Sequence, residues 1–456
     1  MRRYCLMKII IVGGGKSGFA LASALSDEGH DVTIVDNSDE VVSYISNALD
    51  VICVQGSGTD SDVLKDAGVE NADLLIATMR SDETNMICGI AARRLGTKHV
   101  IARVSATQYL KQNEFLRETL GLSVVVNPEY ECAKEISRII KFPSASHVST
   151  FSKCQLEIAE YKIAAGSPLI GLQLKDLPRF GSKVLISVVE RGNEAIIPRG
   201  GFSLRENDRL SVFGSATELR QFFVAIGAYT RKIRNVIIMG GSKIAVYLTG
   251  MLCELGMEVT IIEKDRAKCE MLTDYIPKAN VVYGDATHDD VLIEAGLRNC
   301  DAFVAVSGDN SDNIITSIYA RSKTDAKTVT QVTRDHFAEI SESAGLDSIV
   351  NEKELMSEQI IRYVRAMGNS EGSSMETLYL LADGKAEAAE FYIDKDAPCI
   401  GIPLKDLKLR KDVLIISVIR DNKSLVPDGL SVLEPGDCAI IISPRRTVKN
   451  IGDILT

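Results

Sequence analysis

The chain has 456 residues, with no tryptophan, five histidines and only 5% aromatic side chains. Its ten cysteines are scattered, with no Cys-x-x-C pair and no Cys/His cluster. This spacing argues against structural zinc and predicts reduced thiols that serve as small core residues in a cytosolic protein. We therefore predict no metal site.

Excess positive charge and long apolar runs are also missing. The net charge of −10 argues against a nucleic-acid surface, which needs clustered lysine and arginine. No apolar run approaches the roughly 20 residues of a membrane span, so any connection to a membrane is expected to go through a partner. Met1–Leu6 is too short for a signal peptide and is expected to be an alternative start or a short disordered extension.

A catalytic motif is missing as well. An oxidoreductase needs a general acid or base beside the nicotinamide, and none of the five histidines stands in a recognisable catalytic motif. We therefore expect no catalytic residues and no enzyme activity, with a Rossmann-type NAD-dependent oxidoreductase as the alternative. A nucleotide-sensing transcription regulator, the third possibility, would need a basic recognition helix that the sequence does not supply.

What is present is an internal duplication. Three pairs of similar segments are separated by 227, 228 and 230 residues, and this near-constant offset indicates that a unit of half the chain occurs twice. The pairs are Val32–Val42 with Val259–Lys268, Ala72–Ile87 with Cys300–Ile315, and Ser167–Leu177 with Ala397–Leu407.

Each copy begins with β-branched apolar runs that alternate with amphipathic stretches, a pattern typical of a doubly wound parallel sheet. Short strands divided by glycine and proline turns follow, with one helical piece predicted at Pro168–Leu177 in the first copy. The fold class is therefore α/β, with two tandem Rossmann-like domains, each followed by a small α+β regulatory domain. The predicted domains are 7–146, 147–230, 231–370 and 371–456, and Gly368–Ser374 is the most linker-like segment.

The first copy opens on a nucleotide-binding signature, Gly13-Gly14-Gly15-Lys16-Ser17-Gly18, which reads G-x-G-x-x-G between a predicted strand and a helix. Gly13 permits the tight turn, Gly15 lets the backbone approach a pyrophosphate, and Gly18 lets the helix pack closely. Asp36 ends the second strand, where a carboxylate accepts ribose hydroxyls and disfavours a 2′-phosphate. The pattern predicts NAD rather than NADP, and the alternative is a glycine-rich turn that binds nothing.

The second copy has a weaker signature, Gly240-Gly241-Ser242-Lys243-Ile244-Ala245. Alanine is acceptable at the third glycine position, but the Ser242 side chain is expected to crowd a pyrophosphate. Glu263 replaces the acid of the first copy conservatively. This segment is either a second, weaker nucleotide site or a pseudo-site kept for the symmetry of the fold.

Further candidate ligand contacts follow the third, fourth and fifth strands. The turns 56–60 and 284–288 face the adenine half of a ligand in this fold, and Gly56, Thr59 and Asp285 are the candidates from them. Thr78 and Met79 follow the fourth strand.

Arg103 lies within an otherwise apolar strand, where an arginine is costly unless it pairs with an anion. Either an aspartate is its structural partner, or it reaches a ligand phosphate or a neighbouring subunit. The second copy has Gln331 at this position, which cannot neutralise a phosphate.

Taken together, these motifs resemble the regulator-of-potassium-conductance family, and their tandem arrangement resembles the peripheral NAD-binding subunits of Trk potassium uptake systems. The resemblance covers residues 7–456. It implies no enzyme but a regulatory subunit that binds NAD or NADH, and ATP or ADP at the same sites. By matched motif, Gly13–Gly18, Asp36, Thr78 and Arg103 would contact the ligand, as would Gly240–Ile244 and Glu263 in the second copy.

The resemblance also implies partners. A cytoplasmic homo-oligomer, a tetramer or a dimer of dimers, would dock on an integral membrane potassium transporter (TrkH/TrkG-like) at the inner face of the plasma membrane. Nucleotides would change the shape of this ring and gate ion flow. The small domains resemble the family's C-terminal regulatory domains.

Overall fold

The computed structural model describes residues 6–110, 113–151, 156–181, 183–228, 232–333, 335–346, 348–369, 375–382, 384–421, 423–445, 448 and 450–456. Most of the expected N-terminal extension and of the predicted linker lies outside these ranges. The predicted fold class is confirmed, because two parallel sheets alternate along the chain with two antiparallel sheets. Within the described ranges, no helix combines the length and apolar character needed to cross a bilayer.

The first unit is a six-stranded parallel sheet with the strand order β3-β2-β1-β4-β5-β6. The order reverses between β1 and β4, and ligands of doubly wound folds bind at this switch point, beyond the carboxyl ends of the strands. Its elements are β1 (Lys8–Val12), α1 (Lys16–Asp27), β2 (Asp31–Asp36), α2 (Asp39–Ala48), β3 (Ile52–Gln55), α3 (Ser61–Asp66), β4 (Leu74–Ala77), α4 (Asp82–Leu95), β5 (His99–Arg103), α5 (Thr107–Leu110), α6 (Asn113–Leu120) and β6 (Val124–Val126).

The second unit repeats this topology with the order β14-β13-β12-β15-β16-β17. The same switch point lies between β12 and β15. Its elements are β12 (Asn235–Met239), α9 (Lys243–Glu254), β13 (Glu258–Glu263), α10 (Arg266–Tyr275), β14 (Asn280–Tyr283), α11 (Asp289–Glu294), β15 (Ala302–Ala305), α12 (Asn310–Lys323), β16 (Lys327–Val332), α13 (Asp335–Ser343) and β17 (Ile349–Asn351).

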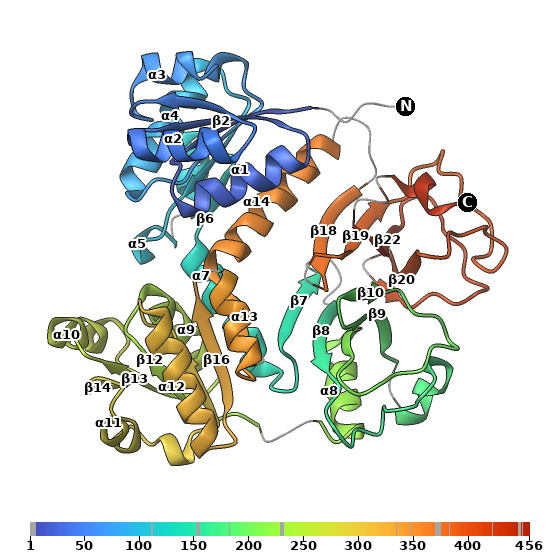
Figure 1. Ribbon diagram of the computed structural model, residues 1–456. Helices are drawn as coiled ribbons and strands as arrows, with labels where there is room; N and C mark the ends of the chain where they lie inside the picture. Colours follow the sequence, from blue (N-terminus) through green and yellow to red (C-terminus); the bar gives the residue numbers. More distant parts are fainter. Residues whose placement is uncertain are drawn as a thin grey trace.

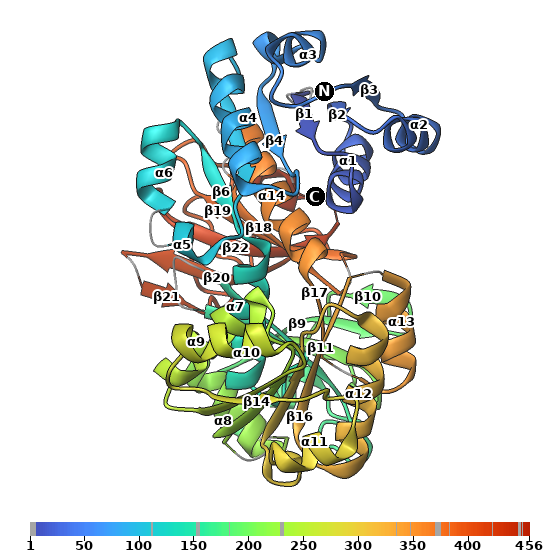
Figure 2. The ribbon, with the colours of Figure 1, turned by 90° about the vertical axis from the view of Figure 1, so that its left-hand side faces the viewer.

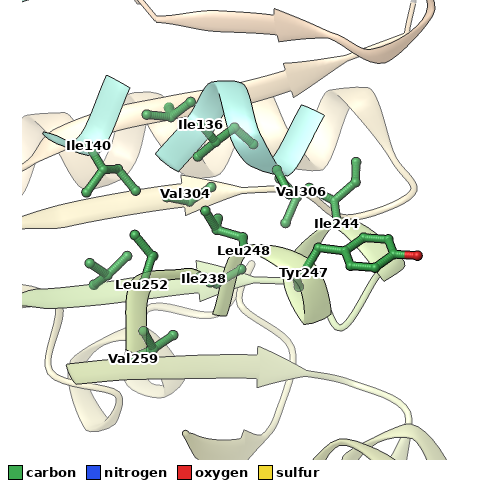
Figure 3. Close-up of a cluster of buried hydrophobic side chains, with 14 of the residues drawn as sticks. Ile136, Ile140, Ile238, Ile244, Tyr247, Leu248, Leu252, Val259, Val304 and Val306 are labelled. Atoms are coloured by element: carbon green, nitrogen blue, oxygen red, sulfur yellow. The ribbon is translucent and has the colours of Figure 1, made fainter. Parts of the chain in front are cut away.

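The last helix of each parallel unit packs on the other unit. In α7 (Pro128–Lys141), Ile136 and Ile140 are buried against α9 and the second sheet, beside Leu248 and Val304 (Figure 3). Each fully buried isoleucine contributes about 1.5–3 kcal/mol, so this exchange is a major part of the interface.

The reciprocal helix, α14 (Glu352–Asn369), buries Ile360 and Val364 against the first sheet and α1. Figures 1 and 2 show α14 leaving the second unit and running alongside α1 of the first. The two parallel units are therefore joined by exchanged helices rather than by surface contact alone.

The two small sheets are antiparallel, in the orders β10-β9-β11-β8-β7 and β18-β19-β22-β20-β21. They pack together through one apolar cluster, in which Phe151 and Phe213 of the first sheet meet Tyr379 of the second. The elements are β7 (His147–Phe151), β8 (Leu156–Lys162), β9 (Leu185–Arg191), β10 (Glu194–Ile196), β11 (Arg209–Ser215), α8 (Ala216–Ala225), β18 (Met375–Leu381), β19 (Ala386–Tyr392), β20 (Leu414–Arg420), β21 (Lys423–Leu425) and β22 (Cys438–Pro444).

The helical piece predicted at Pro168–Leu177 is wrong. The structure has turns in the first part of this segment, and a short 3-10 helix, not an α-helix, covers Leu174–Phe180. Gly171 has a φ of +80°, which a right-handed helix cannot contain. Leu169, Leu172 and Leu177 of this segment are buried in the small-domain core.

Candidate functional site

The loop between β1 and α1 carries the glycine-rich signature at the carboxyl edge of the first sheet. Gly13 has a φ of +104°, and a Cβ on it would lie 3.1 Å from the Met79 nitrogen. A Cβ on Gly18 would lie 1.8 Å from the Gly13 oxygen, so α1 can start this close to the loop only because residue 18 is glycine. A Cβ on Gly15 would meet no atom within 4 Å, and the space beside Gly15 is open.

The first turn of α1 presents backbone N–H groups that no side chain caps. Gly15 is the N-cap residue and offers no side-chain acceptor, and no acidic residue lies in the first turn. Lys16 is exposed and Ser17 is half-buried. An uncapped helix start carries a positive partial charge and binds phosphate favourably.

Asp36 lies at the end of β2, beside this loop. Its Oδ2 accepts a hydrogen bond from the Gly14 nitrogen at 2.7 Å, and its Oδ1 accepts one from the Ser38 nitrogen at 2.9 Å. Each carboxylate oxygen can accept a further bond. The half-buried Asp36 can therefore hold the loop and accept a ribose hydroxyl at the same time.

Thr78 and Met79 follow β4 and contact the loop from the other side. The Thr78 hydroxyl donates to the Gly13 oxygen at 3.1 Å. The Met79 nitrogen donates to Asn85 Oδ1 at 2.8 Å, while Asn85 Nδ2 donates to the oxygens of Met79 and Arg103 at 3.0 and 2.9 Å. Buried Asn85 thus ties together the ends of β4 and β5.

Sequence reasoning missed this asparagine. A signal for it existed, because Asn85 and Asn313 occupy the same place in the repeated segments, 228 residues apart. In the second unit, Asn313 makes the corresponding bonds, accepting from the Ser307 nitrogen at 3.0 Å and donating to the Gln331 oxygen at 3.1 Å.

The turn after β3 completes the first site. Gly56 follows β3, which pairs with β2 beside Asp36, and Thr59 is exposed at the tip of the turn. A Cβ on Gly58 would lie 2.1 Å from a methyl of Val12, so the turn folds directly over β1. Gly58 was not among the predicted site residues, although the segment around it was.

The second unit builds the same loop with a different helix start. Gly240 has a φ of +96°, which is positive like the φ of +104° at Gly13 in the first unit. Ser242 is the N-cap residue of α9, and its Oγ accepts from the Ala245 nitrogen at 3.4 Å. Lys243 is exposed and Ile244 is buried. A serine hydroxyl therefore partners an N–H group that is uncapped in the first unit.

The acid of the second unit is also placed differently. Glu263 is only 7% exposed, and its oxygens accept from the Gly241 and Asp265 nitrogens at 2.7 and 2.8 Å. Its longer side chain is folded under the loop. Asp285, in the turn after β14, accepts from the nitrogen and hydroxyl of Thr287, and these bonds lower the pKa of Asp285.

Arg103 lies at the seam between the two parallel units. Its Nη2 is 3.0 Å from Glu129 Oε1 and 3.8 Å from Glu352 Oε1, and these glutamates lie at the starts of the exchanged helices α7 and α14. Of the two alternatives for Arg103, the aspartate partner is wrong, because the exchanged helices supply two glutamates, and a contact with a ligand phosphate or a neighbouring subunit stays a prediction. Gln331, the counterpart of Arg103, donates to Glu352 Oε2 at 3.4 Å, so both units contribute to this cluster.

The cluster formed by Arg103, Glu129 and Glu352 at this seam contains polar atoms that lack hydrogen-bond partners among the described residues. Within the described residues, Arg103 Nε and Glu129 Oε2 are buried without a partner. Burial, followed by the charge of Glu129, raises the pKa of Glu352 to about 7. The seam therefore holds one arginine and two carboxylates, one of which titrates near neutral pH.

Tyr247 of α9 provides a neutral link across the same seam. Its hydroxyl donates to the Ser105 oxygen and accepts from Asn127 Nδ2, both at 3.0 Å. Ser105 follows β5 and Asn127 caps α7, so the second unit is bonded to the strand ends of the first. Sequence reasoning also missed this residue, because a helical tyrosine gives no local signal of a distant partner.

The comparison with protein families matches all four domains. The TrkA-N domain matches residues 9–128 and 236–352, and the TrkA-C domain matches residues 158–227 and 388–456. A "Trk system potassium uptake protein TrkA homolog" of Archaeoglobus fulgidus is 29% identical over 98% of this chain and 100% of its own length. The "Trk system potassium uptake protein TrkA" of Haemophilus influenzae is 26% identical over 98% of both chains.

Solved structures share the fold. The "GsuK channel bound to NAD" superposes with a TM-score of 0.63 at 20% identity, over 97% of this chain and 78% of that one. The structure of the "GsuK RCK domain" gives a TM-score of 0.64 at 20% identity, over 97% of this chain and 94% of that one. The tandem architecture is therefore shared along nearly the whole chain.

Proposed function

The chain belongs to the TrkA family, defined by its paired TrkA-N and TrkA-C domains, and we propose that it is a nucleotide-binding regulatory subunit of a potassium uptake transporter. Relatives of nearly equal length are named as Trk system potassium uptake proteins. Two neighbours in fold are GsuK structures bound to NAD and to ADP. The proposed ligands are NAD or NADH, with ATP or ADP at the same sites.

The observation that carries the proposal is the open, uncapped start of α1. Open space beside Gly15, free N–H groups in the first turn and the carboxylate of Asp36 provide the groups that a dinucleotide needs. A pyrophosphate would lie over Gly15, and a ribose would bind Asp36. Thr78, Met79, Gly56 and Thr59 would border the ligand.

The exchanged helices give bound nucleotide a route to the rest of the molecule. A ligand shifts an equilibrium only by its different affinity for two states. A nucleotide at Gly13–Gly18 would lie at the same carboxyl edge of the sheet as Arg103, which meets the starts of α7 and α14. We infer that a change in this seam moves the two parallel units relative to each other.

The proposed assembly is a cytoplasmic homo-oligomer, a tetramer or a dimer of dimers, docked on an integral membrane potassium transporter. The chain would act without turning over its nucleotide. Incubation with NADH and a panel of keto and hydroxy acids tests this, and steady substrate-dependent oxidation of NADH would establish an oxidoreductase instead.

The decisive experiment measures binding and transport together. Calorimetry of the full chain with NAD, NADH, ATP and ADP should show binding, most of which Gly15→Asp removes. A deletion strain should take up less potassium at low external potassium, and the Gly15→Asp chain should restore protein level but not the nucleotide response. Unchanged uptake in the deletion strain, with a strictly monomeric purified protein, would count against the gating role.

A further inference from the structure

Arg365 of α14 joins three parts of the chain through two ion pairs. Its Nη2 donates to Glu28 Oε1 at 2.6 Å and its Nε to Glu28 Oε2 at 3.2 Å, while its Nη1 donates to Glu387 Oε1 at 3.1 Å. Glu28 is the C-cap residue of α1 in the first parallel unit, and Glu387 lies in β19 of the second small domain. We call these three residues the Arg365 clamp.

The Arg365 clamp is shielded from solvent. The side chains of Arg365, Glu28 and Glu387 are only 14%, 9% and 3% exposed. Burial opposes the charged form of Arg365, but the hydrogen bonds and charges of the two glutamates outweigh it and raise the pKa of Arg365. An exposed ion pair contributes little, whereas separating a buried one leaves an uncompensated charge and is strongly destabilising. The clamp is therefore a contact that resists being pulled apart.

Helix α1 connects the Arg365 clamp to the first glycine loop. The helix starts at the uncapped N–H groups beside Gly15 and ends at Glu28, with 12 helical residues between them. At about 1.5 Å per residue, the clamp lies roughly 18 Å from the loop along the helix axis. Because α1 is a single continuous helix, a displacement of its first turn also moves its last turn.

The second small domain lies on the other side of the clamp. In Figure 1, α14 runs alongside α1 and ends close to β18, and it contacts both elements. The second small domain is also bonded to the first, because Lys385 Nζ is 2.5 Å from Glu190 Oε1 of β9. The rings of Phe151 and Tyr379 add an apolar contact between the two sheets. A movement of β19 would therefore involve the pair of small domains.

The duplicated half of the molecule does not have the same clamp. The residues at the equivalent positions are Leu255 at the end of α9, Lys141 of α7 and Glu157 of β8. Leu255 carries no charge and is 45% exposed, and Lys141 is also exposed. Within the described residues, Glu157 Oε2 is buried without a hydrogen-bond partner. The complete clamp therefore belongs to the helix that starts at the open glycine loop.

We propose that the Arg365 clamp couples the first nucleotide site to the second small domain, an inference that rests on the proposed nucleotide binding at Gly13–Gly18. A phosphate bound to the first-turn N–H groups of α1 exerts its pull along this helix. A shift of about 1 Å, small for packed helices that slide past each other, takes hydrogen bonds outside their range of about 2.7–3.2 Å. Because breaking the buried contacts is costly, Arg365 and Glu387 follow Glu28. The position of β19 thus depends on whether the first site is occupied.

Hydrogen–deuterium exchange of the full chain, with and without NADH, tests this coupling. In the wild-type chain, NADH should slow amide exchange in the first turn of α1 and should also change the exchange rate of the amides in β19. Calorimetry under the same conditions measures binding itself. The two measurements separate occupation of the glycine loop from its effect on the second small domain.

Two substitutions cut the clamp at opposite ends. Glu28→Leu introduces the residue that the other half has at this position and leaves Arg365 paired with Glu387, whereas Glu387→Gln leaves Arg365 paired with Glu28. Each variant keeps one cation against one carboxylate and so avoids an uncompensated buried charge. In both, NADH should still bind, and the response of β19 should be lost. The matched control, Glu254→Leu, removes a carboxylate from the end of α9 and should keep the full response.

Several results would overturn the coupling while leaving the proposed nucleotide site intact. NADH could bind to the wild-type chain without changing exchange in β19, or both cut variants could keep the wild-type response. Equal loss of the response in Glu254→Leu would also exclude the clamp as its cause. Absence of NADH binding by the wild-type chain is a separate outcome, because it contradicts the proposed nucleotide site and removes the input to the clamp. Circular dichroism checks that each variant is folded.

Discussion

The two parallel units have the same strand order but differ at the start of their first helix. In the first unit, α1 begins at Gly15 with open space and uncapped N–H groups. In the second, Ser242 caps α9 with its own hydroxyl. The accompanying acid is half-buried Asp36 in one case and buried Glu263 in the other.

The same strand order and the same loop turn are therefore compatible with two different helix starts. The fold needs a tight turn and close packing, which Gly13 and Gly240 both provide with positive φ. A phosphate site needs the N–H groups of the next turn to be free, and a capping side chain competes for them.

Gly15→Asp should nearly abolish nucleotide binding at the first site. A carboxylate about 4 Å from a phosphate near a protein surface costs about 4 kcal/mol, so the dissociation constant should rise at least about 100-fold. Calorimetry of the full chain with NADH measures the change. Ser242→Asp is the matched control and should cost much less total binding. Equal losses in the two variants would show that the ranking of the sites is wrong.

Arg103→Gln places in the first unit the residue that the second unit has at this position, which is Gln331. It leaves Glu129 and Glu352 near each other without a cation, and we expect a loss of about 3 kcal/mol in the free energy of unfolding together with a weaker nucleotide response. Denaturant unfolding measures the stability. The double variant Arg103→Gln/Glu129→Gln should recover most of it, and a double variant as unstable as the single one would exclude the seam as the cause.

Glu352 should make stability depend on pH. Its folded pKa of about 7 lies above the ordinary 4.5, so the protonated form is favoured in the folded state. Stability is then greatest below pH 4.5 and falls as the pH rises through 7, by about 3 kcal/mol from this group. Glu352→Gln should flatten this part of the pH profile measured by denaturant unfolding. An unchanged slope in the variant would assign it to other groups.

Ser242→Gly should make the second unit more like the first. Losing the serine cap to glycine costs only a few tenths of a kcal/mol in stability. The freed N–H group should tighten nucleotide binding at the second site by about 1 kcal/mol, or roughly fivefold. Calorimetry on the Gly15→Asp background isolates this site. Binding that remains undetectable there would mean that buried Glu263, and not the serine cap, closes the second site.

Local patterns in the sequence predicted most of the fold. The duplication, the parallel sheets and the glycine turn all depend on periodicity and on residues close in sequence. The prediction of a helical piece failed at Pro168–Leu177, where Gly171 adopts a φ of +80° in a turn. It also missed Asn85 and Tyr247, whose role is to hydrogen-bond groups brought near by folding.

The amino-acid sequence alone determined the two repeated units, the residues of the glycine loops and the weakness of the second signature, because each depends on a few consecutive residues. The tertiary structure decided which sheet α7 and α14 cover, since an apolar helix face does not specify its partner. That exchange placed Glu129 and Glu352 against Arg103 and made the seam. The partner of a buried charge is set by packing between distant segments, which no local pattern contains.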